Sequence, residues 1–76
     1  MATIELDVRG LQAPEPLERV LESLDRLGVD DRLLVKINCR PVPLFRILDR
    51  NGYTHEEWPG TESLLEIAIR KGAPAG

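Results

Sequence analysis

The chain has few of the residues that catalytic and metal sites depend on. Its 76 residues include one cysteine, Cys39, one histidine, His55, and one each of tryptophan, tyrosine and phenylalanine. A single cysteine excludes an intramolecular disulfide, which agrees with a reducing compartment. Cys39 and His55 supply at most two good metal ligands, so we expect neither a metal site nor a cofactor.

Long apolar runs and an excess of positive charge are also absent. No apolar stretch approaches the roughly 20 residues that span a bilayer, and "MATIELDVRG" lacks the basic start and apolar segment of a signal peptide. The net charge is −3, from 13 acidic and 10 basic residues that are interspersed along the chain. We therefore expect a cytoplasmic protein that binds neither membranes nor nucleic acid.

What is present suits one small folded unit. Hydrophobic residues make up 42% and charged residues 30% of the chain, as in ordinary globular proteins, and 76 residues can bury one modest core. We expect a single domain over residues 1–71. The small and helix-breaking residues of "KGAPAG" predict a disordered tail at 72–76.

Apolar patterns predict four strands. Residues 3–8, "TIELDV", alternate apolar and polar residues, as in a strand with one buried face. "RLLVKIN" at 32–38 is almost continuously apolar and predicts a central strand, with Leu34 on the face opposite its apolar neighbours. "YTHEEW" at 53–58 and "LLEIAIR" at 64–70 predict a hairpin joined through "PGTES".

Two helices are expected between these strands, each beginning at a Pro-x-Pro. "PEPLERVLE" starts at Pro14 and "PVPLFRILD" at Pro41, and we place these prolines at the first helical position. Proline fits there because its fixed φ suits the helix and its missing N–H has no intrahelical partner. An amphipathic pattern follows both copies, so the repeat indicates two helix starts more readily than a duplicated active site. The copies differ in polarity, because Glu15 in the first corresponds to Val42 in the second.

The apolar stripes also predict where the helices are buried and where they end. Leu21 and Ile47 lie at the centres of their stripes and are expected in the core. Gly28 is expected to end the first helix in the left-handed conformation, and Asn51 or Gly52 the second.

The order strand, helix, strand, helix, strand, strand predicts an α/β two-layer sandwich. Two right-handed crossovers would place both helices on one face of a four-stranded mixed sheet. The other face would be open to water or to a partner. It is expected to carry Glu5, Asp7, Leu34, Lys36, Glu66 and Trp58.

Residues 6–37, "LDVRGLQAPEPLERVLESLDRLGVDDRLLVKI", resemble the opening of the TusA/SirA family of sulfur-carrier proteins, whose pattern is Leu-Asp-x-x-Gly-Leu-x-Cys-Pro-x-Pro. The order of elements agrees as far as "IAIRK", so the resemblance covers nearly the whole chain. The family carries sulfur as a persulfide on the cysteine of this pattern, and here that position is Ala13. The match runs through Leu6, Asp7, Gly10, Leu11, Pro14 and Pro16.

The chain is more similar to a branch of TusA-like domains of unknown function. This branch is marked by "DVRGL", by a Pro-x-Pro at both helix starts and by "GY" after the second helix. The resemblance therefore implies a fold but no activity, since an alanine cannot carry sulfur.

Cys39 is the candidate for any thiol chemistry. It lies beside Arg40 and close to a helix N-terminus, and both features favour the nucleophilic thiolate. The alternative is a plain buried cysteine, because this residue often packs as a small hydrophobe and no second cysteine exists to resolve an oxidised form. The acids of "HEE" at 55–57 show no ligand spacing and indicate a solvated edge strand.

A second candidate site lies at the carboxyl edge of the parallel strands, where α/β sheets often bind ligands. Asp7 and Arg9 flank Val8 and point to the same side, and Arg40 follows the second strand to the same edge. These residues either anchor the loops or form a patch for a ligand or partner. The candidate patch is Asp7, Arg9, Glu15 and Arg40.

These residues do not assemble a nucleophile, a base and an orienting group, so stand-alone catalysis is disfavoured. We predict a non-catalytic binding or interaction module for a protein partner or small ligand, with the family resemblance pointing to sulfur metabolism. The alternative is a thiol-based sulfur carrier or redox relay that uses Cys39.

Overall fold

The computed structural model describes residues 2–12 and 14–71, in which the expected order of elements is confirmed. Residue 13 and the expected tail at 72–76 lie outside the described residues. In the described part of the chain no helix is long and apolar enough to cross a membrane. The elements are β1 (Thr3–Asp7), α1 (Glu15–Arg26), β2 (Arg32–Ile37), α2 (Val42–Arg50), β3 (Thr54–Pro59) and β4 (Leu65–Arg70).

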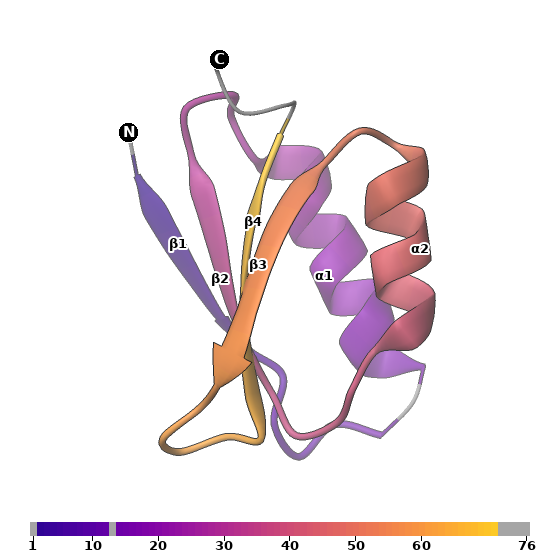
Figure 1. Ribbon diagram of the computed structural model, residues 1–76, viewed down its shortest axis with the longest axis vertical. Coiled ribbons are helices and arrows are strands. Elements are labelled where there is room, and N and C mark those ends of the chain that lie inside the picture. The colour runs from indigo at the N-terminus through magenta and orange to yellow at the C-terminus, as the bar shows by residue number, and fades with distance from the viewer. Residues whose placement is uncertain (1, 13, 72–76) are drawn as a thin grey trace.

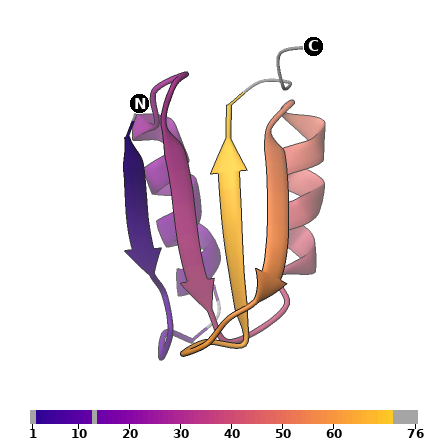
Figure 2. The same cartoon turned by 60° about the vertical axis from the view of Figure 1, so that its left-hand side comes forward.

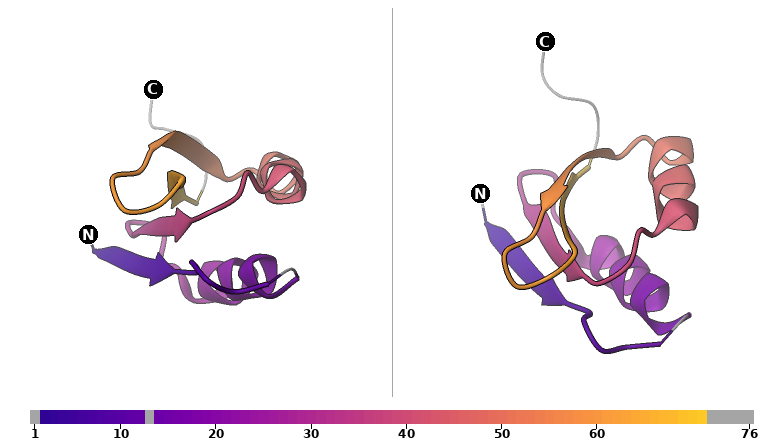
Figure 3. Two further views of the ribbon diagram at one scale, coloured as in Figure 1. Left: turned by 90° about the horizontal axis from the view of Figure 1, so that it is seen from below. Right: turned by 60° about the horizontal axis from the view of Figure 1, so that its bottom comes forward.

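The four strands form one mixed sheet in the order β1-β2-β4-β3. β1 is parallel to β2, while β4 is antiparallel to both β2 and β3, so β1, β2 and β3 all run in the same direction. Both helices cover the same face of this sheet, as Figures 2 and 3 show. The α/β two-layer sandwich is therefore confirmed, with β2 in a central position and β1 and β3 at the edges.

The core fills the space between the helices and the inner face of the sheet. The two central strands supply half of its residues, because their inward residues are covered by neighbours on both sides. Among its members Leu33, Val35 and Ile37 come from β2, and Leu65, Ile67 and Ile69 from β4. The helices add Val20, Leu24, Leu44 and Leu48.

The two helices bury different positions of their shared motif. α1 buries Pro16, Val20 and Leu24, whereas α2 buries Leu44 and Leu48. In the aligned repeat Leu44 corresponds to residue 17 and not to residue 16, so the buried stripe of α2 is displaced by one residue, or about 100° around the helix axis.

The prediction that Leu21 and Ile47 lie in the core is wrong, because each helix is rotated relative to the expected stripe. Leu21 is only partly buried and packs against the edge of the core. Ile47 is also only partly buried and is not among the residues of the core cluster. Val20 and Leu48, one residue away from each, take the central positions because the helix rotation turns them toward the sheet.

Both proline pairs lie at helix starts, but each helix begins one residue later than the sequence predicts. Pro14 and Pro41 are the residues just before α1 and α2, and Pro16 and Pro43 occupy the second helical position. In the part of the chain that the structure describes, no side chain caps either N-terminus. Proline suits the second position as well as the first, because neither N–H has an intrahelical acceptor.

The prediction for Gly28 is wrong, and that for Gly52 is confirmed. Only Gly10 (φ +82°) and Gly52 (φ +76°) adopt the left-handed conformation in the described residues. α1 ends instead at Leu27, which turns to an extended conformation and buries its side chain in the core. Gly28 donates its N–H to Asp31 Oδ2 at 3.0 Å, and a Cβ on residue 28 would lie 2.8 Å from that oxygen. Glycine at residue 28 thus lets the Asp31 side chain lie close to the backbone.

The outer face of the sheet is the one opposite the two helices, and it is mostly polar. The strand register aligns Glu5, Leu34, Ala68 and Glu56 across one row of this face, and Asp7, Lys36, Glu66 and Trp58 across another. Leu34 does lie opposite its apolar neighbours in β2, as the sequence predicts.

Candidate functional site

Three loops meet at one end of the molecule because β1, β2 and β3 are parallel. They are the described residues after β1, 8–12 and 14, the segment after β2, residues 38–41, and the β3–β4 loop, residues 60–64. All lie at the lower end of the sheet in Figure 1. We call this region the loop end.

Asp7 and Arg9 form a bidentate ion pair at the loop end. Arg9 Nε donates to Asp7 Oδ1 at 2.9 Å, and Arg9 Nη2 donates to Asp7 Oδ2 at 2.6 Å. The backbone N–H of Arg9 also donates to Asp7 Oδ1 at 3.0 Å, which closes a turn over Val8. Arg9 Nη1 then reaches the carbonyl oxygen of Glu62 at 2.8 Å. Arg9 thus fastens the first loop to the third.

This contact shifts the pKa values of both partners. The hydrogen bonds from the side chain and the backbone of Arg9 lower the pKa of Asp7 to about 2. The hydrogen bond to Asp7 raises the pKa of Arg9 above its ordinary value. Both groups are therefore charged at neutral pH, and their bidentate geometry holds the guanidinium in place.

Asn38 fastens the second loop to the same β3–β4 loop. Its Oδ1 accepts a hydrogen bond from the N–H of Leu64 at 3.0 Å. The sequence interpretation did not include Asn38 or Glu62, because their partners lie 26 and 53 residues away in the chain. The β3–β4 loop is thus held by both proline-marked loops.

Arg40 faces a different set of neighbours from Arg9. Its Nη2 donates to Glu57 Oε1 on β3 at 2.5 Å, and its guanidinium lies over the ring of Phe45 at 5.7 Å from the centroid. The Arg40 side chain is 61% exposed, compared with 30% for Arg9. Within residues 2–12 and 14–71, Arg40 makes no other hydrogen bond from its side chain, so most of its donors face solvent.

The expectation of a solvated edge strand at "HEE" is confirmed for Glu56 and Glu57, which are exposed on the edge strand β3. His55 is partly buried, stacks on Phe45 with ring centroids 5.0 Å apart, and lies 3.3 Å from Asp49 Oδ1 through its Nε2. Glu57 is exposed and pairs with Arg40, so only His55 departs from the expectation. The pattern of alternating faces along β3 explains this, since residues 55 and 57 point toward α2.

Cys39 is exposed, so the interpretation as a plain buried cysteine is wrong. Glu15 is also exposed, and its backbone N–H donates to the carbonyl oxygen of Gln12 at 3.0 Å. Ala13, the position of the family cysteine, lies outside the described residues. Among the residues that are described, no group of three or more His, Cys, Asp or Glu side chains could hold a metal ion.

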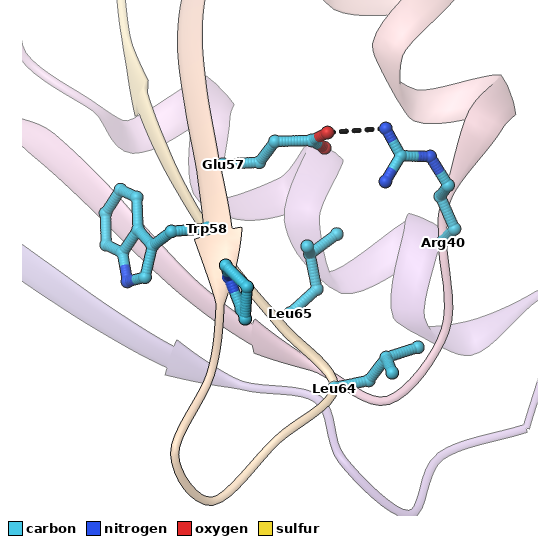
Figure 4. Close-up of a pocket in the computed structure, with 6 residues that line it drawn as sticks. Arg40, Glu57, Trp58, Leu64 and Leu65 are labelled. Carbon is cyan, nitrogen blue, oxygen red and sulfur yellow. Dashed lines mark hydrogen bonds and ion pairs between the residues drawn. The ribbon is translucent and has the colours of Figure 1, made fainter.

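A pocket of about 500 Å³ opens between the second loop and the β3–β4 hairpin. Figure 4 shows Glu57 and Arg40 facing each other across its upper wall, with Leu65 and Leu64 below them. The indole ring of Trp58 points to the opposite side of β3 from Glu57. The lining residues are Arg40, Glu57, Trp58, Pro59, Leu64 and Leu65.

The structure therefore joins only part of the expected patch. Asp7 and Arg9 are in contact, and Arg40 belongs to the pocket instead. Across residues 2–12 and 14–71, no hydrogen bond or ion pair connects Arg40 or Glu15 to the Asp7–Arg9 pair. The loop end thus holds a fastened region around Arg9 and an open pocket beside Arg40.

Comparison with solved structures identifies the class of protein. A SirA-like protein from Desulfitobacterium hafniense matches with a TM-score of 0.66 and 26% sequence identity, over 96% of this chain and 100% of that chain. The chain therefore has the SirA/TusA-like fold that the sequence resemblance implied. No curated protein matches it. Residues 5–71 match the family described as "Uncharacterized conserved protein (DUF2249)", and the chain belongs to this family.

Proposed function

We propose that this protein is a small non-catalytic binding module that works through its loop end. The observation that supports the proposal is the pocket beside Arg40. A hydrogen bond between Leu64 and Asn38 joins its two sides, the β3–β4 hairpin and the second loop. A concave, largely apolar site with a few polar groups is the usual form of a binding site. A protein partner or a small ligand in the cytoplasm is the proposed occupant.

The residue at position 13 supports a role other than sulfur carriage. The SirA/TusA pattern has a cysteine there, and this sequence has Ala13. A persulfide needs a sulfur atom to attach to, so the usual carrier chemistry is removed at that position.

The arrangement of the reactive side chains supports a non-catalytic role. His55 is turned toward Phe45 and Asp49 on α2. In the described part of the chain, no hydrogen bond links Cys39 to His55 or to any acid. A nucleophile and its base need to lie within hydrogen-bond reach of each other, and that pair is not assembled here.

NMR of the ¹⁵N-labelled protein tests this proposal. Cell extract, separated into macromolecules and small molecules, is added to the wild type and to Cys39→Ser. We expect backbone signals of residues 38–42 and 57–65 to shift or broaden with one fraction, equally in both proteins. Arg40→Ala should weaken the response, whereas Arg50→Ala at the end of α2 is a matched control. A response confined to the outer face of the sheet would contradict the proposal.

A second candidate function is a thiol relay, favoured by the exposure of Cys39. It predicts that incubation with a persulfide donor adds the mass of one sulfur atom to Cys39, and that Cys39→Ser abolishes transfer. Mass spectrometry of the intact protein distinguishes this function from the binding module, which predicts no stable adduct.

A further inference from the structure

The pocket beside Arg40 combines an apolar floor with a polar pair of zero net charge. Leu64 and Leu65 with Pro59 supply the apolar part, and Arg40 and Glu57 supply the pair. Since the pair is neutral overall, it offers little attraction for a free anion or cation. It suits an occupant that is uncharged at this point.

The pair nevertheless keeps hydrogen-bonding groups free. The bond between them uses Arg40 Nη2 and Glu57 Oε1. Within the described residues, Nε and Nη1 of Arg40 and Oε2 of Glu57 make no hydrogen bond. These atoms provide donors and an acceptor side by side, which is the complement of an amide group with its carbonyl oxygen and its N–H.

The position of β3 favours a peptide over a free small molecule. β3 is an edge strand, so among the described residues one side of its backbone has no neighbouring strand in the sheet. Extended peptides bind such edges through main-chain hydrogen bonds and place alternate side chains in pockets. Glu57 and Pro59 of the pocket belong to this strand.

Exposed apolar residues extend the contact area around the pocket. Leu64 is 60% exposed at its lower wall. Trp58, which also lines the pocket, is 36% exposed. Exposed apolar side chains around a pocket are typical of surfaces that bind protein segments.

We propose that this pocket binds an extended, uncharged segment of a partner protein, with an apolar side chain on Leu64 and Leu65 and a main-chain amide on Arg40 and Glu57. This inference rests on the proposed binding function and specifies its occupant. The neutral pair selects against acidic segments, because Glu57 repels a carboxylate that Arg40 would otherwise attract.

Capped tripeptides test the chemistry of the occupant. Acetyl-Ala-Leu-Ala-amide, its Ala-centred and Asp-centred analogues, and a version with N-methyl leucine are titrated into the ¹⁵N-labelled protein. We expect the Leu peptide to shift the signals of residues 57–65 most strongly, with the Ala peptide binding about tenfold more weakly because it buries less apolar surface. The N-methyl and Asp peptides should also bind more weakly, since they lose an amide donor or meet Glu57.

The variant Glu57→Gln sharpens this test. It leaves Arg40 as an unopposed cation, so the Asp peptide should gain affinity relative to the Leu peptide by about tenfold or more. Glu22→Gln on α1 makes the same change in net charge at an exposed position and should leave the order of the peptides unchanged.

The outcomes separate this inference from the proposed function. Preference of the wild type for the Asp peptide, or no difference between the Leu and N-methyl peptides, would overturn the inference. If no peptide shifts residues 57–65 while cell extract still does, the peptide occupant is wrong and the binding module stands. If neither acts on these residues, both proposals fail.

Discussion

The two proline-marked helix starts share a sequence motif and differ in what surrounds them. Arg9 before the first is bound by Asp7 and by the backbone of Glu62, whereas Arg40 before the second is bound by one carboxylate and is twice as exposed. The first loop also turns through Gly10, at φ +82°. The first copy thus mainly links the loops of the loop end, and the second leaves hydrogen-bond donors of Arg40 exposed.

The two copies also bury different positions of the motif. Leu17 of α1 and Leu44 of α2 occupy the same position of the repeat, but only Leu44 is fully buried. Packing against the sheet, and not the motif, decides which residues of each helix face the core. The likeness of the two copies therefore does not indicate a shared chemistry.

The largest effect on stability should come from truncating Leu44, the fully buried member of this pair. Leu44→Ala removes a side chain that is 0% exposed and should cost about 2–5 kcal/mol of unfolding free energy. Leu17→Ala, at the matched and only partly buried position, should cost clearly less. Denaturant melts measure both, and equal losses would show that the two helices are not rotated as described.

Gly10→Ala tests whether the first loop depends on its left-handed turn. No atom lies within 4 Å of a Cβ built on Gly10, so the cost comes from the backbone conformation alone. We expect a loss of about 1–2 kcal/mol in the unfolding free energy. Gly28→Ala is the comparison, because its φ is not left-handed and its contact is with the side chain of Asp31. A neutral Gly10→Ala would mean that the loop relaxes.

The ion pair of the first loop should give stability a specific acid dependence. The pKa of Asp7 falls to about 2 in the folded protein, from 3.8. A lowered pKa stabilises the folded state above the unfolded value, and this contribution is lost as pH falls through about 2. Asp7→Asn should therefore be less stable than the wild type at neutral pH. The difference should shrink between about pH 4 and pH 2, as measured by denaturant melts at each pH.

The local elements could be predicted from the sequence, and the contacts of the site could not. The continuous apolar run of β2 and the prolines before the helices are local signals, and the structure confirms both. The pairs Arg40–Glu57 and Arg9–Glu62 join residues 17 and 53 positions apart, so only the folded sheet brings them together. The rotation of α2 that buries Leu48 in place of Ile47 also depends on packing against the sheet, which sequence periodicity does not fix to one residue.

The smallest effect on stability is expected at Cys39, which lies next to Arg40 before the second copy of the motif. Its side chain is exposed, so Cys39→Ser should change the unfolding free energy by no more than about 0.5 kcal/mol. The native protein should react with a neutral alkylating reagent without denaturant, at a rate close to that of a free thiol such as glutathione. Such a rate would mean that the second loop leaves the Cys39 thiol accessible without increasing its reactivity. A rate well above that of glutathione would show that Arg40 and the start of α2 stabilise the thiolate, because only that form is the nucleophile. The second copy of the motif would then be a reactive site, and the relay would replace the binding module as the favoured function.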